Sequence, residues 1–206
     1  MVKSSTARSR NKRGEGELLR EEIVTAALEA VRAGGTPETI TLRAISRRIG
    51  IAPTSIYAHF ATMDDIFKAA AQVGFEELTA VLRQSAVKHK DPKRRLKALV
   101  TAYVLFGQAQ PFLYRLLFLT PLKRTGEPIA GTAGGDAFGE LLAAMATLSA
   151  LGLSGHKDPL LGAALVWTAL HGYVTLSTTH QDFPWPEQSK LLDELVHRVA
   201  AIASTG

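Results

Sequence analysis

The chain has 206 residues with no cysteine, and 24 Lys/Arg against 19 Asp/Glu give a net charge of +5. This length can bury a core in one domain, or in a small domain attached to a larger one. The absence of cysteine excludes disulfides and thiolate metal sites. Residues 1–60 hold ten Lys/Arg and six Glu, so residues 61–206 are almost neutral. This asymmetry predicts a module that binds a polyanion, joined to a neutral, more apolar part.

The first segment, residues 1–16, is basic and polar, and no acid precedes Glu15. It has no apolar run of the kind found in secretory signals. Two interpretations remain open: a flexible solubilising tail, or an arm that reaches phosphates or a minor groove. Apolar residues at helical spacing then predict a helix over residues 17–33, ended by two glycines.

Residues 41–60 predict two short helices joined by a tight turn. Thr41 is a good N-cap, and apolar residues follow it at i, i+3 and i+7. Gly50 suits a helix C-terminus, where positive φ is common, and Pro53 suits the first turn of the next helix. The second helix, expected over residues 53–60, leaves hydroxyls, a phenol and an imidazole outside, and these groups bond phosphates and base edges. An ordinary helical hairpin with a polar face is the alternative.

This stretch ends in Tyr-x-His-Phe, at residues 57–60, and it resembles the helix-turn-helix of the TetR family of transcriptional regulators. The match runs from about Leu18 to Phe75, so it covers the first helix, the motif and the start of a long fourth helix capped by Thr62. In TetR-like proteins a lysine after that cap commonly touches the DNA backbone. Met63 stands there in this chain, and Lys68 is the candidate replacement.

The resemblance implies contact with double-stranded DNA. Arg43 is expected to donate to guanine or to a phosphate, whereas Arg47 and Arg48 fit solvent as well as backbone contact. The expected DNA-contacting residues are Thr41, Arg43, Pro53, Thr54, Ser55, Tyr57, His59 and Lys68.

The remainder predicts more helices, so the expected fold is all-α, with about nine helices. The expected domains are the arm at 1–16, a helix-turn-helix domain at 17–63, and a ligand-binding and dimerisation bundle at 64–206. A Gly- and Pro-rich loop is expected at 123–135. The further helices are expected at about 62–87, 91–110, 112–119, 136–151 and 159–179, and a last helix is expected after a turn at 181–186.

Residues 159–180 contain no Asp, Glu, Lys or Arg, but Gly, His, Ser and Thr dilute them. We therefore expect a buried bundle helix and not a membrane span. The last helix carries an apolar stripe at Leu191, Leu195, Val199 and Ile202. These two helices offer more apolar face than one subunit needs, which predicts a homodimer built on a four-helix contact. The alternative is that both helices are fully used within one subunit.

The sequence Trp-Thr-Ala-Leu-His-Gly at 167–172 resembles the Trp-His-Gly signature of one branch of TetR C-terminal domains, which usually enclose a ligand. Each aromatic residue is also explained as plain core, and His171 as an interior histidine and not a metal ligand. No spacing supports a metal or another cofactor. The expected ligand-pocket residues are Tyr103, Phe106, Phe112, Tyr114, Trp167, His171 and Tyr173.

Three functional hypotheses follow. The first is a cytoplasmic homodimeric repressor that leaves a palindromic operator when a small, largely apolar or aromatic ligand binds. The second is a DNA-binding dimer without such an effector. The third is a helical ligand-binding or enzymatic bundle with an incidental basic head. However, the sequence has no nucleophile elbow, no phosphate-cradling Gly loop and no paired carboxylates in an apolar setting, so an enzyme is not expected.

Overall fold

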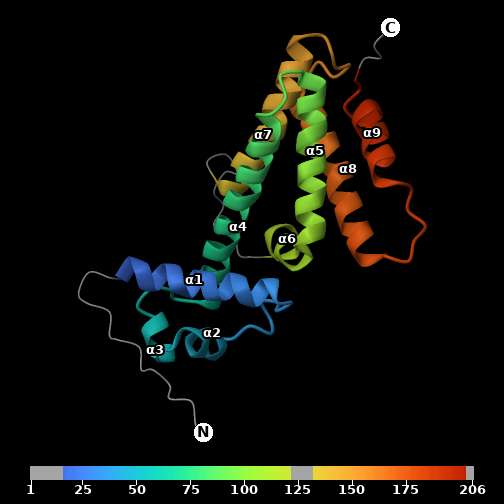
Figure 1. The fold of residues 1–206 in the computed structure, drawn as a ribbon. Coiled ribbons are helices and arrows are strands. Elements are labelled where there is room, and N and C mark those ends of the chain that lie inside the picture. The colour runs from blue at the N-terminus through green and yellow to red at the C-terminus, as the bar shows by residue number, and fades with distance from the viewer. Residues whose placement is uncertain (1–15, 122–131, 203–206) are drawn as a thin grey trace. The chain divides into compact units, whose positions relative to one another are not determined.

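The computed structural model describes residues 16–121 and 132–202, and nine α-helices lie within them (Figure 1). The all-α class is confirmed. Contacts divide the chain into two compact units, and α4 (Met63–Ala86) contributes to both, with its residues up to Ala71 in the first. The first unit also contains α1 (Gly16–Arg32), α2 (Leu42–Ile49), α3 (Pro53–Ile56) and most of α6 (Pro111–Phe118). The second contains α5 (Pro92–Ala109), α7 (Ala133–Ala150), α8 (Pro159–Thr179) and α9 (Gln188–Val199).

The first three helices form a small core in the first unit. α1 packs against α2, and α2 packs against α3. Ile23 of α1, Ile45 of α2 and Ile56 of α3 are at most 1% exposed. The Arg20 guanidinium lies 4.8 Å from the centre of the Phe60 ring, a cation–π contact at the edge of this core. Burial against α1 therefore holds helices that are too short to be stable alone.

α6 belongs to the first unit, although α5 separates it in sequence from the helices at the start of the chain. Its Phe112 ring lies against Gly34, because a Cβ added to Gly34 would be 3.5 Å from that ring. Gly34 has φ +97°, a left-handed conformation that other residues rarely adopt. The buried residues of α6 are Leu113, Tyr114 and Leu116.

The second unit is a bundle in which α5 packs against α7, α8 and α9, and α8 packs against α7 and α9. Arg83 of α4 joins α7 through an ion pair with Glu140 at 2.6 Å. α5 and α8 both begin at an Asp-Pro pair, where Asp91 and Asp158 accept a hydrogen bond from the first helical turn. The expected starts of both helices are therefore confirmed.

The end of α3 and the start of α7 differ from the sequence expectation. α3 ends at Ile56 and a turn replaces its expected second half, in which the His59 N–H donates to the Ile56 carbonyl at 2.9 Å. α7 begins at Ala133 and not at residue 136, because the Thr132 hydroxyl accepts the Gly135 N–H at 3.1 Å. Thr132–Gly135 is thus a cap and a first turn. The rest of the expected loop, residues 123–131, lies outside the described residues, as do residues 1–15 of the expected arm.

The last helix is shorter than expected. α9 ends at Val199, and Ile202 lies beyond it in an isolated bridge with Ser154. Leu192 and Val196 are the buried residues of α9, whereas the expected stripe is only half-buried. The side of α9 that carries this stripe is therefore not consumed by its own unit.

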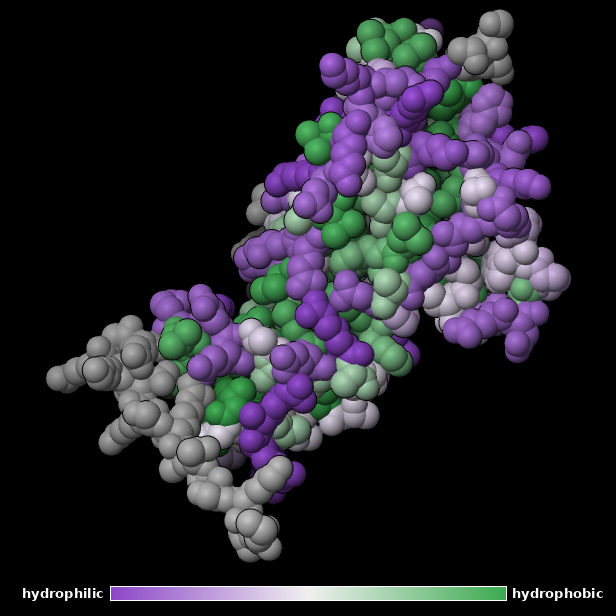
Figure 2. Space-filling view, in the orientation of Figure 1, coloured by the Kyte–Doolittle hydropathy of each residue, from purple (hydrophilic) through white to green (hydrophobic). Residues whose placement is uncertain are grey.

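α8 has one buried side and one exposed apolar side. Val166 and Leu170 are buried, whereas Leu161 and Leu165 are 52% and 42% exposed. Among the described residues it is the one helix long and apolar enough to cross a membrane by length and composition, with 33% of its most apolar window buried. Figure 2 shows hydrophobic side chains lying between hydrophilic ones on the face in view. The exposed side of α8 is therefore an apolar surface that the described part of the chain leaves open.

Candidate nucleic-acid interface

α2 is fixed at both of its ends. The Thr41 hydroxyl accepts the Ala44 N–H at 3.2 Å, which caps the start of the helix as expected. At the other end Gly50 adopts φ +72° and ψ 34°, and the Ile51 N–H donates to the Ser46 carbonyl at 3.0 Å. These bonds satisfy groups that a helix of eight residues otherwise leaves to water. The side chains of α2 therefore project from a helix whose two ends are held by hydrogen bonds.

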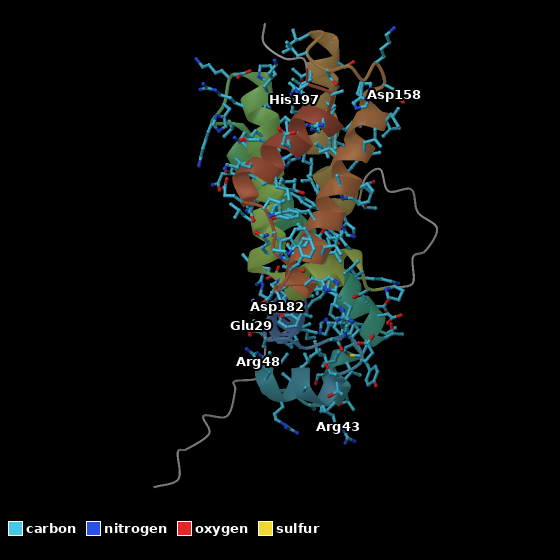
Figure 3. All side chains as sticks on the ribbon, turned by 90° about the vertical axis from the view of Figure 1, so that its right-hand side faces the viewer. Glu29, Arg43, Arg48, Asp158, Asp182 and His197 are labelled. Carbon is cyan, nitrogen blue, oxygen red and sulfur yellow. The ribbon has the colours of Figure 1, made fainter. Side chains whose placement is uncertain are left out.

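The arginines of α2 have different environments. Arg48 donates to Glu29 of α1 at 2.8 Å, so its charge is already partnered. Arg43 and Arg47 are exposed and make no ion pair within the part of the chain that the structure describes. Figure 3 shows Arg43 at the end of this unit away from Glu29, and Arg48 beside Glu29. The sequence predicts the same environment for Arg47 and Arg48, because no sequence pattern shows that Glu29 would face one of them.

α3 and the turn after it present polar groups above two buried side chains. Ile56 and Phe60 anchor the segment, at 0% and 4% exposure. Tyr57 is 59% exposed. The expected contact residues of this segment are exposed or half-buried: Pro53, Thr54, Ser55, Tyr57 and His59.

Lys68 lies on α4 within the first unit and is half-exposed. Its ammonium nitrogen is 3.8 Å from Asp65, a loose and exposed pair of the kind that contributes little stability. Asp65 is itself held by Thr62, whose hydroxyl and N–H donate to it at 2.7 and 3.0 Å. These hydrogen bonds lower the pKa of the Asp65 carboxyl. The Lys68 ammonium is therefore held only loosely by its carboxylate partner.

The expected ligand-pocket residues fall in both units. Phe112 and Tyr114 lie in the first unit, where Phe112 is 46% exposed and Tyr114 is buried. A hollow of about 80 Å³ in that unit includes Phe112, Glu38 and Arg115 in its lining. The residues in the second unit are Tyr103, Phe106, Trp167, His171 and Tyr173, and of these Tyr103, Phe106 and Tyr173 are buried.

Trp167 and His171 form part of an aromatic cluster between α7 and α8. The Trp167 ring meets Phe138 edge-on at 5.7 Å and lies 6.1 Å from the His171 ring. Burial lowers the pKa of His171, which favours its neutral form. One turn further along, the Thr175 hydroxyl is buried without a hydrogen-bond partner among the described residues. No sequence pattern marks this hydroxyl, since helical threonines usually bond their own backbone.

Metal binding has no structural support in the described residues, because no group of three or more His, Cys, Asp or Glu there could hold an ion.

Two family models match the chain. The model of bacterial regulatory proteins of the tetR family matches residues 23–70. The model of the tetracyclin repressor-like C-terminal domain matches residues 96–200, just over half of the chain. The chain belongs to the TetR family. It is therefore a DNA-binding transcriptional regulator, and the TetR family is a family of regulators and not of enzymes.

Individual relatives are consistent with membership of the TetR family. An uncharacterized HTH-type transcriptional regulator of Mycobacterium tuberculosis, Rv0681, is 28% identical over 79% of this chain and 72% of its own length. A solved protein of unknown function from Rhodococcus sp. RHA1 has a TM-score of 0.74 and 22% identity, with 96% of each chain covered. The regulator FadR of Bacillus subtilis, solved with stearoyl-CoA, has a TM-score of 0.66 and 14% identity, covering 88% of this chain and 97% of its own. At these identities the two solved structures establish the fold alone.

Proposed function

We propose that the chain is a cytoplasmic homodimeric repressor that leaves a palindromic operator when a small, largely apolar or aromatic ligand binds. The observation that carries the DNA-binding part is the exposed Arg43 on a doubly capped α2, beside an α3 segment with exposed Thr54 and Tyr57. Each subunit lays α3 in a major groove, and two such segments related by twofold symmetry read the two half-sites of an inverted repeat.

The exposed side of α8 supports a dimer. Leu161 and Leu165 expose apolar surface, and α9 adds the half-buried Leu191 and Leu195. Burying this surface against the same surface of a second copy gives a four-helix contact with twofold symmetry. That symmetry is the one that a palindromic operator requires.

The aromatic cluster of the second unit supports an effector site. Trp167, His171 and Gly172 keep the order of the Trp-His-Gly branch, and we assign the chain to that branch. The unpaired Thr175 hydroxyl offers a hydrogen bond to a polar group of a ligand whose body contacts aromatic rings. FadR of Bacillus subtilis was solved with stearoyl-CoA, so long-chain acyl thioesters are the first ligand class to test.

Release of the operator follows from a shift in populations. The ligand binds more tightly to dimers whose two α3 segments are wrongly spaced for the operator, and it thereby draws the protein away from DNA. α4 is the proposed transmitting element, because its residues are shared between the two compact units.

The test has two steps. The wild-type protein first selects duplexes from a random-sequence pool, and we expect an inverted repeat. The selected duplex, labelled with fluorescein, is then titrated by anisotropy with and without saturating stearoyl-CoA or an aromatic carboxylic acid that raises the melting temperature. We expect weaker operator binding with ligand. Selection of an asymmetric sequence would contradict the palindromic operator, and equal affinity with and without a stabilising ligand would contradict ligand-controlled release.

One observation favours the second hypothesis, a dimer without an effector. Tyr103, Phe106 and Tyr173 are already buried by their own unit, so packing alone accounts for them. A thermal-shift screen separates the two hypotheses, because a protein without an effector site shows no stabilising compound in either ligand class.

A further inference from the structure

The strongest charge concentration in the second unit covers the turn between α4 and α5 and the start of α5. Residues 72–111 and 126–206 carry ten Lys/Arg and eleven Asp/Glu, and residues 88–97 alone hold six of those bases and one acid. The rest of the unit therefore has four bases against ten acids. We name this cationic surface the basic corner; its residues are Lys88, Lys90, Lys93, Arg94, Arg95 and Lys97.

Ion pairs within the unit involve two of these cations, since Lys97 pairs with Asp193 of α9 and Arg94 lies 3.8 Å from Asp91. The first turn of α5 contains no acid, and Lys93, Arg94 and Arg95 lie there. Cations near a helix N-terminus are repelled by the helix dipole, so this effect opposes all three positions. Lys88, Lys90 and Arg95 make no ion pair among the described residues. Ion pairs with described residues therefore account for only part of the basic corner.

The basic corner borders a hollow between α5 and the end of α9. Arg94 is 79% exposed at its rim, and Lys97 is bridged to Asp193 of α9. Figure 3 shows His197 on α9 at this end of the bundle, where nitrogen-tipped side chains extend from the green α4–α5 region. Apolar side chains from α9 and the segment after it complete the lining. The hollow is lined by Lys93, Arg94, Lys97, Asp193, Val196, His197 and Ile202.

The size and lining of this hollow point to the class of partner. Its volume is about 190 Å³, whereas pockets that bury a small ligand measure roughly 300–1,000 Å³. One apolar side chain of a larger partner fits it better than a free small molecule. Nucleic acid needs only cations for its phosphates and gains nothing from Val196 and Ile202. An acidic peptide with aliphatic or aromatic side chains uses both the rim and the apolar lining.

We propose that the basic corner and its hollow form a docking site for an acidic protein segment that inserts an apolar side chain beside Val196 and Ile202. This interaction is separate from operator and effector binding, since it uses neither the α2–α3 surface nor the aromatic cluster. It gives the regulator a means of contacting another protein.

The test uses the full chain and fluorescein-labelled synthetic peptides, followed by anisotropy. The probe peptide alternates glutamate with leucine and phenylalanine. One matched peptide replaces its glutamates by glutamines, and another replaces its apolar residues by alanines. We expect the probe to bind, more weakly as salt rises, and both matched peptides to bind roughly tenfold more weakly or not at all. Equal binding of the probe and the alanine peptide would overturn the insertion of an apolar anchor.

Arg94→Glu is the decisive variant. Position 94 is the third residue of α5, where a glutamate faces the free N–H groups of the first turn, so the melting temperature should stay the same or rise. Peptide affinity should fall roughly tenfold or more, because a rim cation becomes an anion. Arg94→Gln should give a smaller loss. Operator binding should not change in either variant.

Lys190→Glu is the matched control. It makes the same change in net charge on α9, and Lys190 is not in the lining of the hollow. We expect near-normal peptide binding in this variant. Equal losses in Lys190→Glu and Arg94→Glu would reduce the effect to net charge and overturn the proposal. The proposal would also be overturned if Arg94→Glu weakened binding to nonspecific duplex DNA or to phosphatidylserine vesicles more than binding to the probe peptide.

Discussion

Gly50 is the residue on which the turn between α2 and α3 depends. Its φ of +72° is in the left-handed region, and a Cβ placed there would meet no atom within 4 Å. Any cost of Gly50→Ala therefore comes from the backbone and not from crowding. We expect Gly50→Ala to lower the free energy of unfolding by about 1–2 kcal/mol, and thermal denaturation measures this change.

Gly139→Ala is the natural comparison, since Gly139 is inside α7 and a Cβ added there would also meet no atom within 4 Å. Here alanine should stabilise by roughly 0.5–1 kcal/mol, because it reduces the entropy lost on helix formation. The same substitution should thus have opposite signs at the two positions. A stabilised Gly50→Ala protein would refute the argument from backbone conformation.

Arg43 and Arg48 should contribute differently to DNA binding, although both are exposed arginines of one helix. Arg43→Ala removes a guanidinium with no ion pair among the described residues, and we expect operator binding to weaken by about 1–3 kcal/mol. Arg48→Ala removes a charge already bonded to Glu29, so its effect on affinity should be smaller. Anisotropy titrations of the selected duplex measure both. Equal affinity of Arg43→Ala and wild type would remove Arg43 from the interface.

At the scale of an element, the stabilising effect of the cap at the start of α4 should depend on pH through Asp65. Hydrogen bonds from Thr62 lower the pKa of Asp65 below its ordinary value of 3.8. A carboxyl whose pKa is lower in the folded state stabilises the fold above its unfolded pKa, and this contribution is lost as pH falls through the folded pKa.

Asp65→Asn should therefore be less stable than wild type at neutral pH, and the difference in melting temperature should shrink in acid below the ordinary pKa of the carboxyl. Melting curves of the two proteins across this range provide the measurement, and the other acids titrate alike in both. A difference that stayed constant with pH would show that the charge of Asp65 has no part in the cap.

Helix boundaries were predictable where a local cap marks them. Asp91 and Asp158, each followed by proline, fix the starts of α5 and α8, and Thr41 fixes that of α2. The prediction was wrong at α7 because Thr132 caps a turn that contains two glycines, which the composition favoured as loop. It was wrong at the end of α9 because Ile202 pairs with Ser154, a contact between distant parts of the chain.

For the whole molecule, the decisive prediction concerns the exposed side of α8. Leu165 is 42% exposed, so Leu165→Glu should leave the fold of its own subunit intact. A charge buried in a dimer contact is costly, so we expect sedimentation velocity to show monomers. Operator binding should weaken as well, because a monomer has only one α3 segment.

Leu151→Glu supplies the control, because Leu151 is 59% exposed and apolar but lies outside α8. This variant should sediment like wild type. A Leu165→Glu protein that sediments as wild type would exclude the proposed dimer contact, and parallel effects of both variants would indicate general loss of solubility.

The candidate site was predictable in proportion to how local its residues are. Thr41, Arg43 and Tyr57 lie within one short stretch whose turn residues and apolar spacing fix their faces. The proposed ligand residues come from segments far apart, and nothing in the spacing showed that Phe112 and Tyr114 would join the first unit and not the second. The partnering of Arg48 by Glu29 was out of reach for the same reason, since it depends on the packing angle of two helices.

The contact between Gly34 and Phe112 also bears on how the protein is made. The first unit is assembled from two stretches of chain that leave the ribosome at different times, with all of α5 synthesised between them. α2 and α3 thus leave the ribosome long before α6, the segment that completes their unit. During synthesis the first unit should complete its fold only after α6 has been made. Fragments that stop after α4 should therefore fold less stably than the same helices in the full chain.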